Sequence, residues 1–296
     1  MRITQSMLNS QMLYDLQGNA QRLSQLQNEA ATGHRINSPA DDPIGVGFVM
    51  QYTNETSYNK QYSNNAQAAQ SVLSFTGSTM SEATQVMQRA RDLAVQGSSG
   101  TLTSSDRQAL ASEVGQLYQQ LVTVGNSQYN QQYVFNGQAT TQAPYSNASA
   151  QTATTDNGRV FYDLGNGVNL PVSIPGNQFF GSASDTNNAF AVLKQLQTAL
   201  TNNDGTAAGN TIAQIDSRTN AMLASQAEVG ALTNRAQMMQ SRMTDLTQNV
   251  QGVLSNVQDA NLAQVITDLN TAQTVQSASL QVGAKIIQPT LLDFLK

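Results

Sequence analysis

The residues that could do chemistry are few in this sequence. His34 is the only histidine and cysteine is absent, so a catalytic triad, a thiolate nucleophile or a histidine–cysteine metal site has almost nothing from which to be built. His34 lies between Gly33 and Arg35 and is expected to be a solvated loop residue. We therefore predict no catalytic residue, no cofactor, no metal and a protein that is not an enzyme.

A carboxylate pair at Asp41 and Asp42 could also be given a chemical role. Because the pair directly precedes Pro43, a favoured first residue of a helix, capping of the helix that begins there explains it more simply. The nearby stretch GVGFVM at 45–50 lacks the third glycine and the preceding strand of a dinucleotide-binding loop. The pattern is typical of a break between two helices.

Composition excludes several classes of protein. The formal net charge of −5 and the pI near 4.7 provide no basic surface, so nucleic-acid binding is not expected. No apolar run approaches the length of about 18 residues that a membrane span needs. Polar residues interrupt the start of the chain, so no cleaved signal peptide is expected if the protein leaves the cytoplasm. Charged residues make up only 11%, against about 25% in ordinary domains. Such a surface suits packing among like subunits, although a compositional bias of the organism would give the same pattern.

The elements around these residues are predicted to be long helices. Apolar residues at steps of three and four indicate a first helix over 3–32, ended by Gly33, and a second from Pro43 to about Gln96. Thr103 and Asp106 fit a capping box that opens a third helix. The second helix has the spacing of a coiled-coil seam, formed by Tyr62, Ala66, Ala69, Leu73, Thr76, Met80, Ala83, Met87, Ala90 and Ala94.

The second half of the chain repeats the helical pattern after an interruption. Strand-like aromatics begin near 129, and 137–185 is dense in Gly, Asn, Thr, Ser and Pro, which predicts a small β insert. A helix over 187–202, a turn at 204–209 and a heptad helix through 222–257 are expected next. Asp259 or Asn261 caps a separate terminal helix. The heptad series are Met222, Val229, Ala236, Met243, Val250 and Val257, and Leu232, Met239, Leu246, Val253 and Ala260.

These elements predict a mainly α fold. The N- and C-terminal halves should form a long antiparallel coiled-coil rod with a small β-rich domain inserted at mid-chain. In an isolated monomer, 1–35 and 262–296 are expected to be largely disordered and to order on a partner. The expected domains are a terminal coiled-coil assembly domain of 1–41 and 258–296, a helical rod of 42–136 and 187–257, and the β insert of 137–186.

Several stretches resemble the bacterial flagellins and their junction relatives. They are ATGHRINSPADDPIG after the first helix, RDLAVQGSSGTLTSSDRQALASEVGQLYQQL, and YVFNG at the entry to the insert. The ending QVGAKIIQPTLLDFLK is similar to that of the flagellar hook-associated protein 3 family, the hook–filament junction proteins, and unlike the usual flagellin ending. The resemblance covers about 1–145 and 210–296, and no resemblance is claimed for the middle, 146–185.

The resemblance implies a structural adaptor of the extracellular bacterial flagellum. It would join the hook, through the first junction protein, to the flagellin filament, after export through the flagellar type III channel. Further implied partners are copies of itself in a ring and an export chaperone on the C-terminal segment. Neither nucleic acid nor a membrane is implied.

Three sets of residues carry this reading. The inter-domain hinge is assigned to Gly33, Arg35, Asn37, Asp41, Asp42 and Pro43. The rod seam is assigned to Leu73, Met80, Met87, Leu232, Met239, Met243, Leu246 and Val250. The assembly interface is assigned to Leu13, Leu16, Leu23, Leu26, Leu262, Ile266, Leu269, Leu280, Ile287, Leu291, Leu292, Phe294 and Leu295.

Other readings remain open. A flagellin-type filament subunit is the nearest alternative and would polymerise alone into long filaments. An enzyme or adhesin whose insert carries the activity would bind or turn over a ligand at 137–186. An unrelated coiled-coil scaffold would leave the terminal motifs unexplained.

Overall fold

The computed structural model describes residues 5–287, and its described part is mainly helical with two small two-stranded sheets. The expected mainly α fold with β structure near mid-chain is confirmed at this level. Residues 59–245 form one compact unit, the central unit, and 1–58 with 246–296 form another, the terminal unit. No described helix combines the length and the hydropathy needed to cross a membrane.

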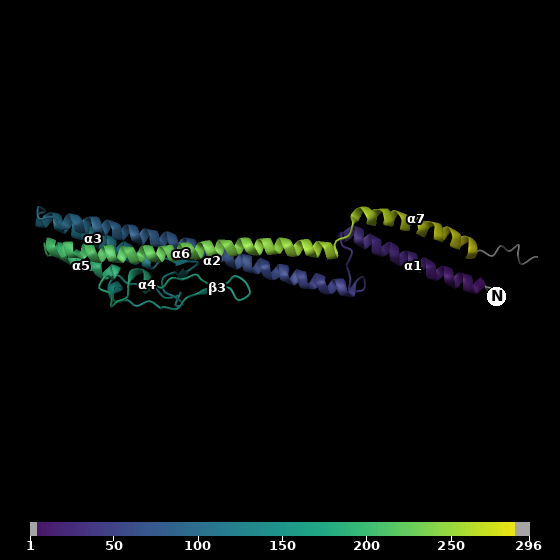
Figure 1. The fold of residues 1–296 in the computed structure, drawn as a ribbon, viewed down its shortest axis with the longest axis horizontal. Helices are drawn as coiled ribbons and strands as arrows, with labels where there is room; N and C mark the ends of the chain where they lie inside the picture. The colour runs from purple at the N-terminus through teal and green to yellow at the C-terminus, as the bar shows by residue number, and fades with distance from the viewer. Residues whose placement is uncertain (1–4, 288–296) are drawn as a thin grey trace, which may run out of the picture. The chain divides into compact units, whose positions relative to one another are not determined.

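The central unit is built on helices, and nearby capping side chains define where α3 and α5 begin. Its helices are labelled in Figure 1; two of them, α2 and α6, continue into the terminal unit. Their bounds are α2 (Pro43–Gly97), α3 (Ser104–Gly125), α4 (Gly176–Phe180), α5 (Ala189–Thr201) and α6 (Gly205–Gln258). Thr103 and Asp106 close the expected capping box at the start of α3. Asn188, which the sequence did not single out, caps α5 by accepting from the amides of Phe190 and Ala191.

Helices α2 and α6 pack antiparallel within the central unit. Gln226 donates to Thr84 Oγ1 at 3.0 Å, and Arg91 pairs with Asp216 at 2.6 Å, so positions rise along one helix as they fall along the other. The apolar seam runs along the same two helices, and its buried members include Leu73, Met80, Met87, Met222, Val229 and Ala236. Side chains at heptad spacing therefore provide this contact.

The turn expected at 204–209 is wrong, because α6 begins at Gly205. Asp204 Oδ1 accepts from the amide of Ala207 at 2.9 Å and caps the helix. The small residues that follow allow close packing instead of forming a loop. A Cβ at Gly205 would lie 3.0 Å from the guanidinium of Arg107, and one at Gly209 would lie 3.4 Å from Ser98.

The β insert has less strand than its composition suggested. Strand pairing is confined to two short antiparallel hairpins, β1 (Gln128–Tyr129) with β2 (Gln132–Tyr133) and β3 (Phe161–Asp163) with β4 (Asn169–Pro171). A 3-10 turn, η1 (Ala150–Thr152), and α4 complete it. Phe135, Phe179 and Phe180 are fully buried; the rings of Phe135 and Phe179 stack, and Phe180 meets both of them edge-on. Aromatic packing therefore organises this region, and Arg159 joins it to α6 through Glu228 at 2.9 Å.

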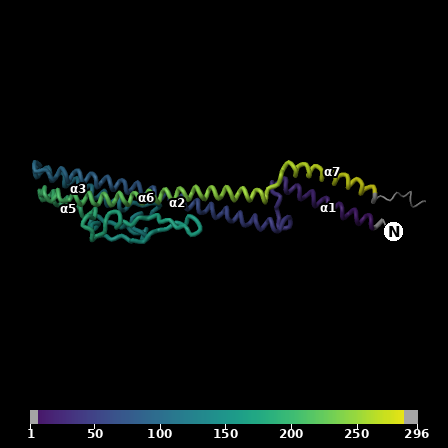
Figure 2. The backbone as a smooth tube through the Cα atoms, in the orientation of Figure 1, coloured from purple at the N-terminus to yellow at the C-terminus, as the bar shows by residue number. Residues whose placement is uncertain are grey.

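The terminal unit contains α1 (Gln5–Thr32) and α7 (Leu262–Ile287), which lie side by side in Figures 1 and 2. Gly33, at φ 75°, ends α1 in the left-handed conformation that glycine favours. Asn19 donates to Ser279 at 3.2 Å, and a Cβ at Gly283 would meet the Met12 side chain at 2.7 Å. The two helices are therefore antiparallel.

Candidate functional site

Two breaks in the helical chain meet in the terminal unit. Residues 33–35 lie against 257–260, and His34 and Asp259 form an isolated antiparallel bridge. The Arg35 amide donates to Gln258 O at 2.7 Å, and the Ala260 amide donates to Gly33 O at 2.8 Å. We call these two segments the clasp. Backbone hydrogen bonds thus fix both breaks to each other although more than two hundred residues separate them in the sequence.

Side chains add a polar layer to the clasp. His34 Nδ1 lies 2.9 Å from Asp259 Oδ1. A hydrogen bond from the Ser255 hydroxyl, and then the contact with His34, hold the pKa of Asp259 below its usual value. His34 is therefore more than the solvated loop residue expected from the sequence, because its ring is held by an acid from the second break. Both side chains remain more than 40% exposed, so the contribution of the pair to stability is small.

Arg35 reaches across both breaks. Its Nη2 atom donates to Val257 O at 3.0 Å and lies 3.5 Å from Asp42 Oδ2. A guanidinium suits this position because its rigid fork of donors can serve a carbonyl and a carboxylate together. The arginine thereby links the start of α2 to the end of α6.

Asp41 and Asp42 accept hydrogen bonds from different parts of the nearby backbone. Asp42 Oδ1 accepts from the Gly45 amide at 2.8 Å, which is the expected cap of the helix that begins at Pro43. Asp41 Oδ2 instead accepts from the amides of Asn37 and Ser38, at 3.0 and 2.8 Å, and closes the preceding turn. Those two backbone bonds, that from Ser38 first, lower the pKa of Asp41.

The structure brings the six expected hinge residues into one segment around this turn. Whether the segment bends remains a prediction. Sequence reasoning missed Ile36, which is only 4% exposed and whose Cδ1 would lie 2.6 Å from a Cβ at Gly45. Ile36 could have been found because it is an apolar residue among polar neighbours. Sequence reasoning also missed the pairing of Asp259 with His34, for which the sequence contains no local signal.

The expected assembly interface is divided between two surfaces. Leu16, Leu23, Leu26 and Leu269 are half-buried in the α1–α7 pair. Leu13, Leu262, Ile266 and Leu280 are between 45% and 55% exposed. Ile287 ends α7 but its side chain, like Leu291, Leu292, Phe294 and Leu295, lies outside the described residues. The second group leaves apolar surface open on the pair, and the exposed side chains of Met7, Leu8, Tyr14, Val275 and Val282 add to it.

Burial along the expected rod seam changes between the two units. Leu73, Met80 and Met87 are fully buried, and Met243 is nearly so, whereas Leu232 and Met239 are half-buried in the central unit. Leu246 and Val250, in the terminal unit, are also half-buried, and Val253 beyond them is 44% exposed. The heptad pattern of α6 therefore continues beyond Met243, although its later members are only partly buried.

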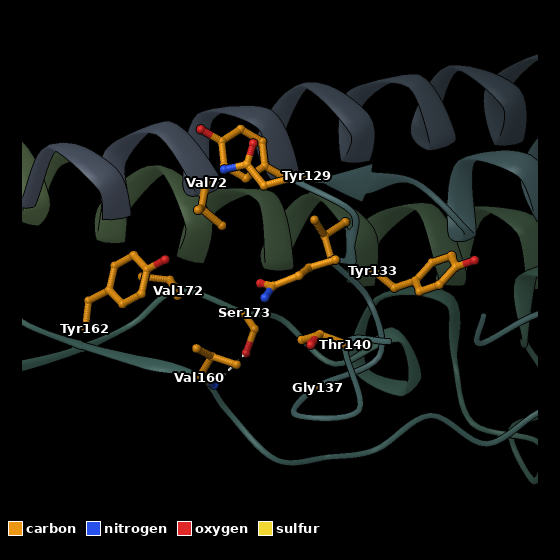
Figure 3. A pocket seen from close by; sticks show the side chains of 12 residues that line it. Val72, Tyr129, Tyr133, Gly137, Thr140, Val160, Tyr162, Val172 and Ser173 are labelled. Carbon is orange, nitrogen blue, oxygen red and sulfur yellow. Dashed lines mark hydrogen bonds between the residues drawn. The ribbon is translucent and has the colours of Figure 1, made fainter. Parts of the chain in front are cut away.

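A small cavity where the insert meets α2 and the β1–β2 hairpin offers little to a ligand (Figure 3). It holds about 80 Å³ and is lined by residues that include Val72, Tyr129, Val160 and Ser173, well below the roughly 300–1,000 Å³ of ligand pockets. The Val160 amide donates to Ser173 Oγ at 2.9 Å within it. Among the described side chains, no group of three histidines and acids gathers to hold a metal.

Comparison with known proteins places this architecture among flagellar proteins. Residues 3–140 match the bacterial flagellin N-terminal helical region. The chain is 26% identical to flagellar hook-associated protein 3 of Salmonella typhimurium, covering 96% of this chain and 95% of that protein. It is also 24% identical to the flagellin of Listeria innocua, covering 95% and 94%.

A solved structure shares the fold. The flagellar hook-associated protein 3 of Legionella pneumophila matches with a TM-score of 0.62 at 17% identity, over 72% of this chain and 98% of that one. The expected resemblance to the hook-associated protein 3 family, within the wider flagellin-like group, is confirmed by these findings. They also bear out the expectation of a protein that is not an enzyme, because the similarity is to flagellar structural proteins.

Proposed function

Because this chain is similar along nearly its whole length to flagellar hook-associated protein 3, we propose that it is a structural adaptor between hook and filament. The observation that carries the proposal is the coverage of 96% of this chain and 95% of that relative. The relatives support a structural role in the extracellular flagellum. The finer position, at the hook–filament junction, is our inference from the hook-associated relatives.

The open surface of the terminal unit supports assembly through both ends of the chain. The α1–α7 pair keeps Leu13, Leu262, Ile266 and Leu280 half exposed or nearly so, and exposed apolar side chains that recur along a helix favour burial against further helices. We propose that these residues, together with the end of the chain beyond 287, contact neighbouring subunits. Leu16, Leu23, Leu26 and Leu269 would hold the pair together within one subunit.

The proposed domains divide the chain at its helix breaks. The assembly domain would be 1–41 with 258–296, the rod 42–136 with 187–257, and the insert 137–186. Breaks at 33–42 and 259–261 support the first boundary, and antiparallel α2 and α6 support a rod. Residues 33–43 would be the hinge between assembly domain and rod, with the clasp limiting how far it opens.

The proposed partners follow from the proposed position between the hook and the filament. They are the first junction protein on the hook side, flagellin on the filament side, and copies of this chain in a ring. An export chaperone would hold the C-terminal segment before assembly and so cover its apolar residues. Localisation would be extracellular, after type III export.

A flagellin-type filament subunit is the second candidate, favoured by the match to the Listeria innocua protein over 95% of this chain. The two candidates differ in abundance and position. Immunogold labelling of tagged protein on intact flagella separates them, since an adaptor gives a narrow band between hook and filament. Labelling along the whole filament would overturn the adaptor proposal.

A truncation tests the proposed role of the chain end. Removal of 281–296 should leave a folded central unit that neither joins hooks nor supports filament growth. Circular dichroism supplies the control for folding. Normal filaments in cells that make only the truncated chain would contradict the proposal.

A further inference from the structure

Three asparagines in or directly before the insert precede glycine, and their local surroundings differ. They are Asn136, Asn157 and Asn166. Asparagine followed by glycine is chemically labile, because glycine has no Cβ to keep its amide nitrogen away from the preceding side chain. The local structure decides whether that nitrogen can reach the side-chain carbonyl.

Asn136 is held on every side. It is 7% exposed, its Nδ2 donates to Ala139 O and Gln142 O, at 3.1 and 3.0 Å, and its Oδ1 accepts from the Asp156 amide at 3.1 Å. A Cβ at Gly137 would lie 2.3 Å from Asp156 O. Rotation of the Asn136 side chain towards the Gly137 nitrogen would require all of these contacts to break.

Asn157 is exposed, but the Gly158 amide nitrogen that would attack it already donates a hydrogen bond. The Gly158 amide donates to Asp156 Oδ1 at 3.2 Å, and Asn157 Oδ1 accepts from Asn177 Nδ2 at 3.2 Å. The Gly158 amide must therefore leave Asp156 before it can attack, and the bond to Asn177 restrains the rotation that would bring Asn157 Cγ to it.

Asn166 lies at the tip of the β3–β4 hairpin without such restraints. Asn166 and Gly167 are exposed, and Gly167 has φ 74° with open space where a Cβ would point. The turn is closed below the tip, by Val168 N to Gly165 O at 2.9 Å and Leu164 N to Val168 O at 2.8 Å. Within the described part of the chain, neither the Asn166 side chain nor the Gly167 amide makes a hydrogen bond.

We propose that Asn166 is a site of spontaneous deamidation in the folded protein, whereas Asn136 and Asn157 are protected by the fold. The Gly167 amide nitrogen loses its proton and attacks Asn166 Cγ. A carbon–nitrogen bond forms, Nδ2 leaves as ammonia, and a five-membered succinimide results. Water then opens either carbonyl of the ring and yields aspartate or isoaspartate. One water is consumed, one ammonia is released and no oxidation state changes.

The product would alter the hairpin. Either acid adds a negative charge at the tip, and isoaspartate also adds a methylene to the backbone of a turn closed by two hydrogen bonds. Leu164, beside that turn, is fully buried. The modification would therefore change the charge and the backbone of the β3–β4 turn beside this buried residue.

Peptide mass spectrometry of the full chain tests the proposal. The native protein and a urea-denatured sample are incubated in mildly alkaline buffer made with heavy-oxygen water, and deamidation is timed at each asparagine. Denatured chains should react similarly at all three sites. In the native protein Asn166 should react on the order of tenfold or more faster than Asn136, with Asn157 between them.

Two variants test the cause. Asp156→Ala should raise the rate at Asn157 and leave that at Asn166 unchanged, because it frees the amides of Gly158 and Gln138 but no group at the tip of the β3–β4 hairpin. Asn166→Ser should remove the fast site and its heavy-oxygen incorporation. A native rate at Asn166 as slow as that at Asn136, or slower than that at Asn157, would overturn the proposal.

Discussion

Two arginines are buried in the central unit, and both donate hydrogen bonds to the backbone. Arg107 is 7% exposed and donates to Gly97 O, Ser99 O and Asn203 Oδ1 at 3.0, 2.7 and 2.6 Å. It faces the carboxyl end of α2, where a cation is favoured. Arg218 is 4% exposed and binds Asn187 O at 2.9 Å; burial lowers its pKa, which the nearby Asp185 only partly offsets.

Arg107→Ala should destabilise the central unit by about 2–4 kcal/mol, because charged hydrogen bonds are lost and buried carbonyls are left without donors. Urea unfolding followed by circular dichroism measures the change. Arg89→Ala is the matched control, since Arg89 and its partner Glu113 are 52% and 41% exposed; a loss under about 1 kcal/mol is expected there. Equal losses in the two variants would show that Arg107 is not a structural cation.

Acid should lower the stability of the fold by protonating carboxylates that accept hydrogen bonds in the native state. Hydrogen bonds from the Thr103 side chain and amide lower the pKa of Asp106, and the Gln138 and Gly158 amides lower that of Asp156. Their native pKa values lie below the unfolded value near 3.9. The stability that they contribute is therefore present above that unfolded pKa and is lost as the pH falls through the native pKa.

The melting temperature should accordingly fall between about pH 5 and about pH 2. Asp106→Asn should make this acid dependence shallower, since one carboxylate with a lowered pKa is removed. Thermal melts across the pH series measure it. Asp245→Asn, at an exposed residue with no hydrogen bond in the described part of the chain, should leave the slope unchanged.

At the scale of elements, the terminal helices should be much less stable than the central ones. No residue of α1 whose burial is described is buried, and among those of α7 only Val265 and Gly283 are. The stretch 66–94 of α2 has a buried residue in nearly every turn. Since protection follows burial, amides of α1 and α7 should exchange hydrogen orders of magnitude faster than those of 66–94 in the dilute protein. Equal protection measured by mass spectrometry would contradict the proposed partner-dependent order.

The open face of α7 can be tested without disturbing its contact with α1. Ile266→Asn and Leu280→Asn alter side chains that are 53% and 54% exposed, so the monomer should keep its helix content while binding to isolated hooks and swimming motility are lost. Thr267→Asn, at an exposed polar position one residue away, is the control. Normal motility in the first two variants would remove these residues from the proposed interface.

At the scale of the whole molecule, the adaptor proposal predicts that purified protein stays monomeric. A ring subunit needs the hook as its template, whereas a filament subunit adds to copies of itself. Sedimentation and negative-stain microscopy in the presence of filament seeds measure this, with a flagellin as the positive control. Long filaments of this chain alone would favour the alternative.

Local sequence determined the helices well. Gly33, Pro43 and the Thr103–Asp106 box mark ends that the structure places at the same positions, because caps and turns depend on residues within one helical turn of each other. The apolar seam of α2 was also predicted from the sequence, because the spacing of its residues places them on one face of the helix. The turn at 204–209 was wrong because glycine and alanine serve a loop and a close helix contact equally well.

The sequence by itself therefore determined the order, ends and apolar faces of the helices, and the absence of residues from which familiar catalytic sites are built. Tertiary structure alone decided that His34 meets Asp259, that Arg107 is buried, and that Leu16 is covered while Leu13 remains open. It also decided that one Asn–Gly pair is free and two are held. These outcomes depend on contacts between residues far apart in the chain, which periodicity and capping rules do not encode.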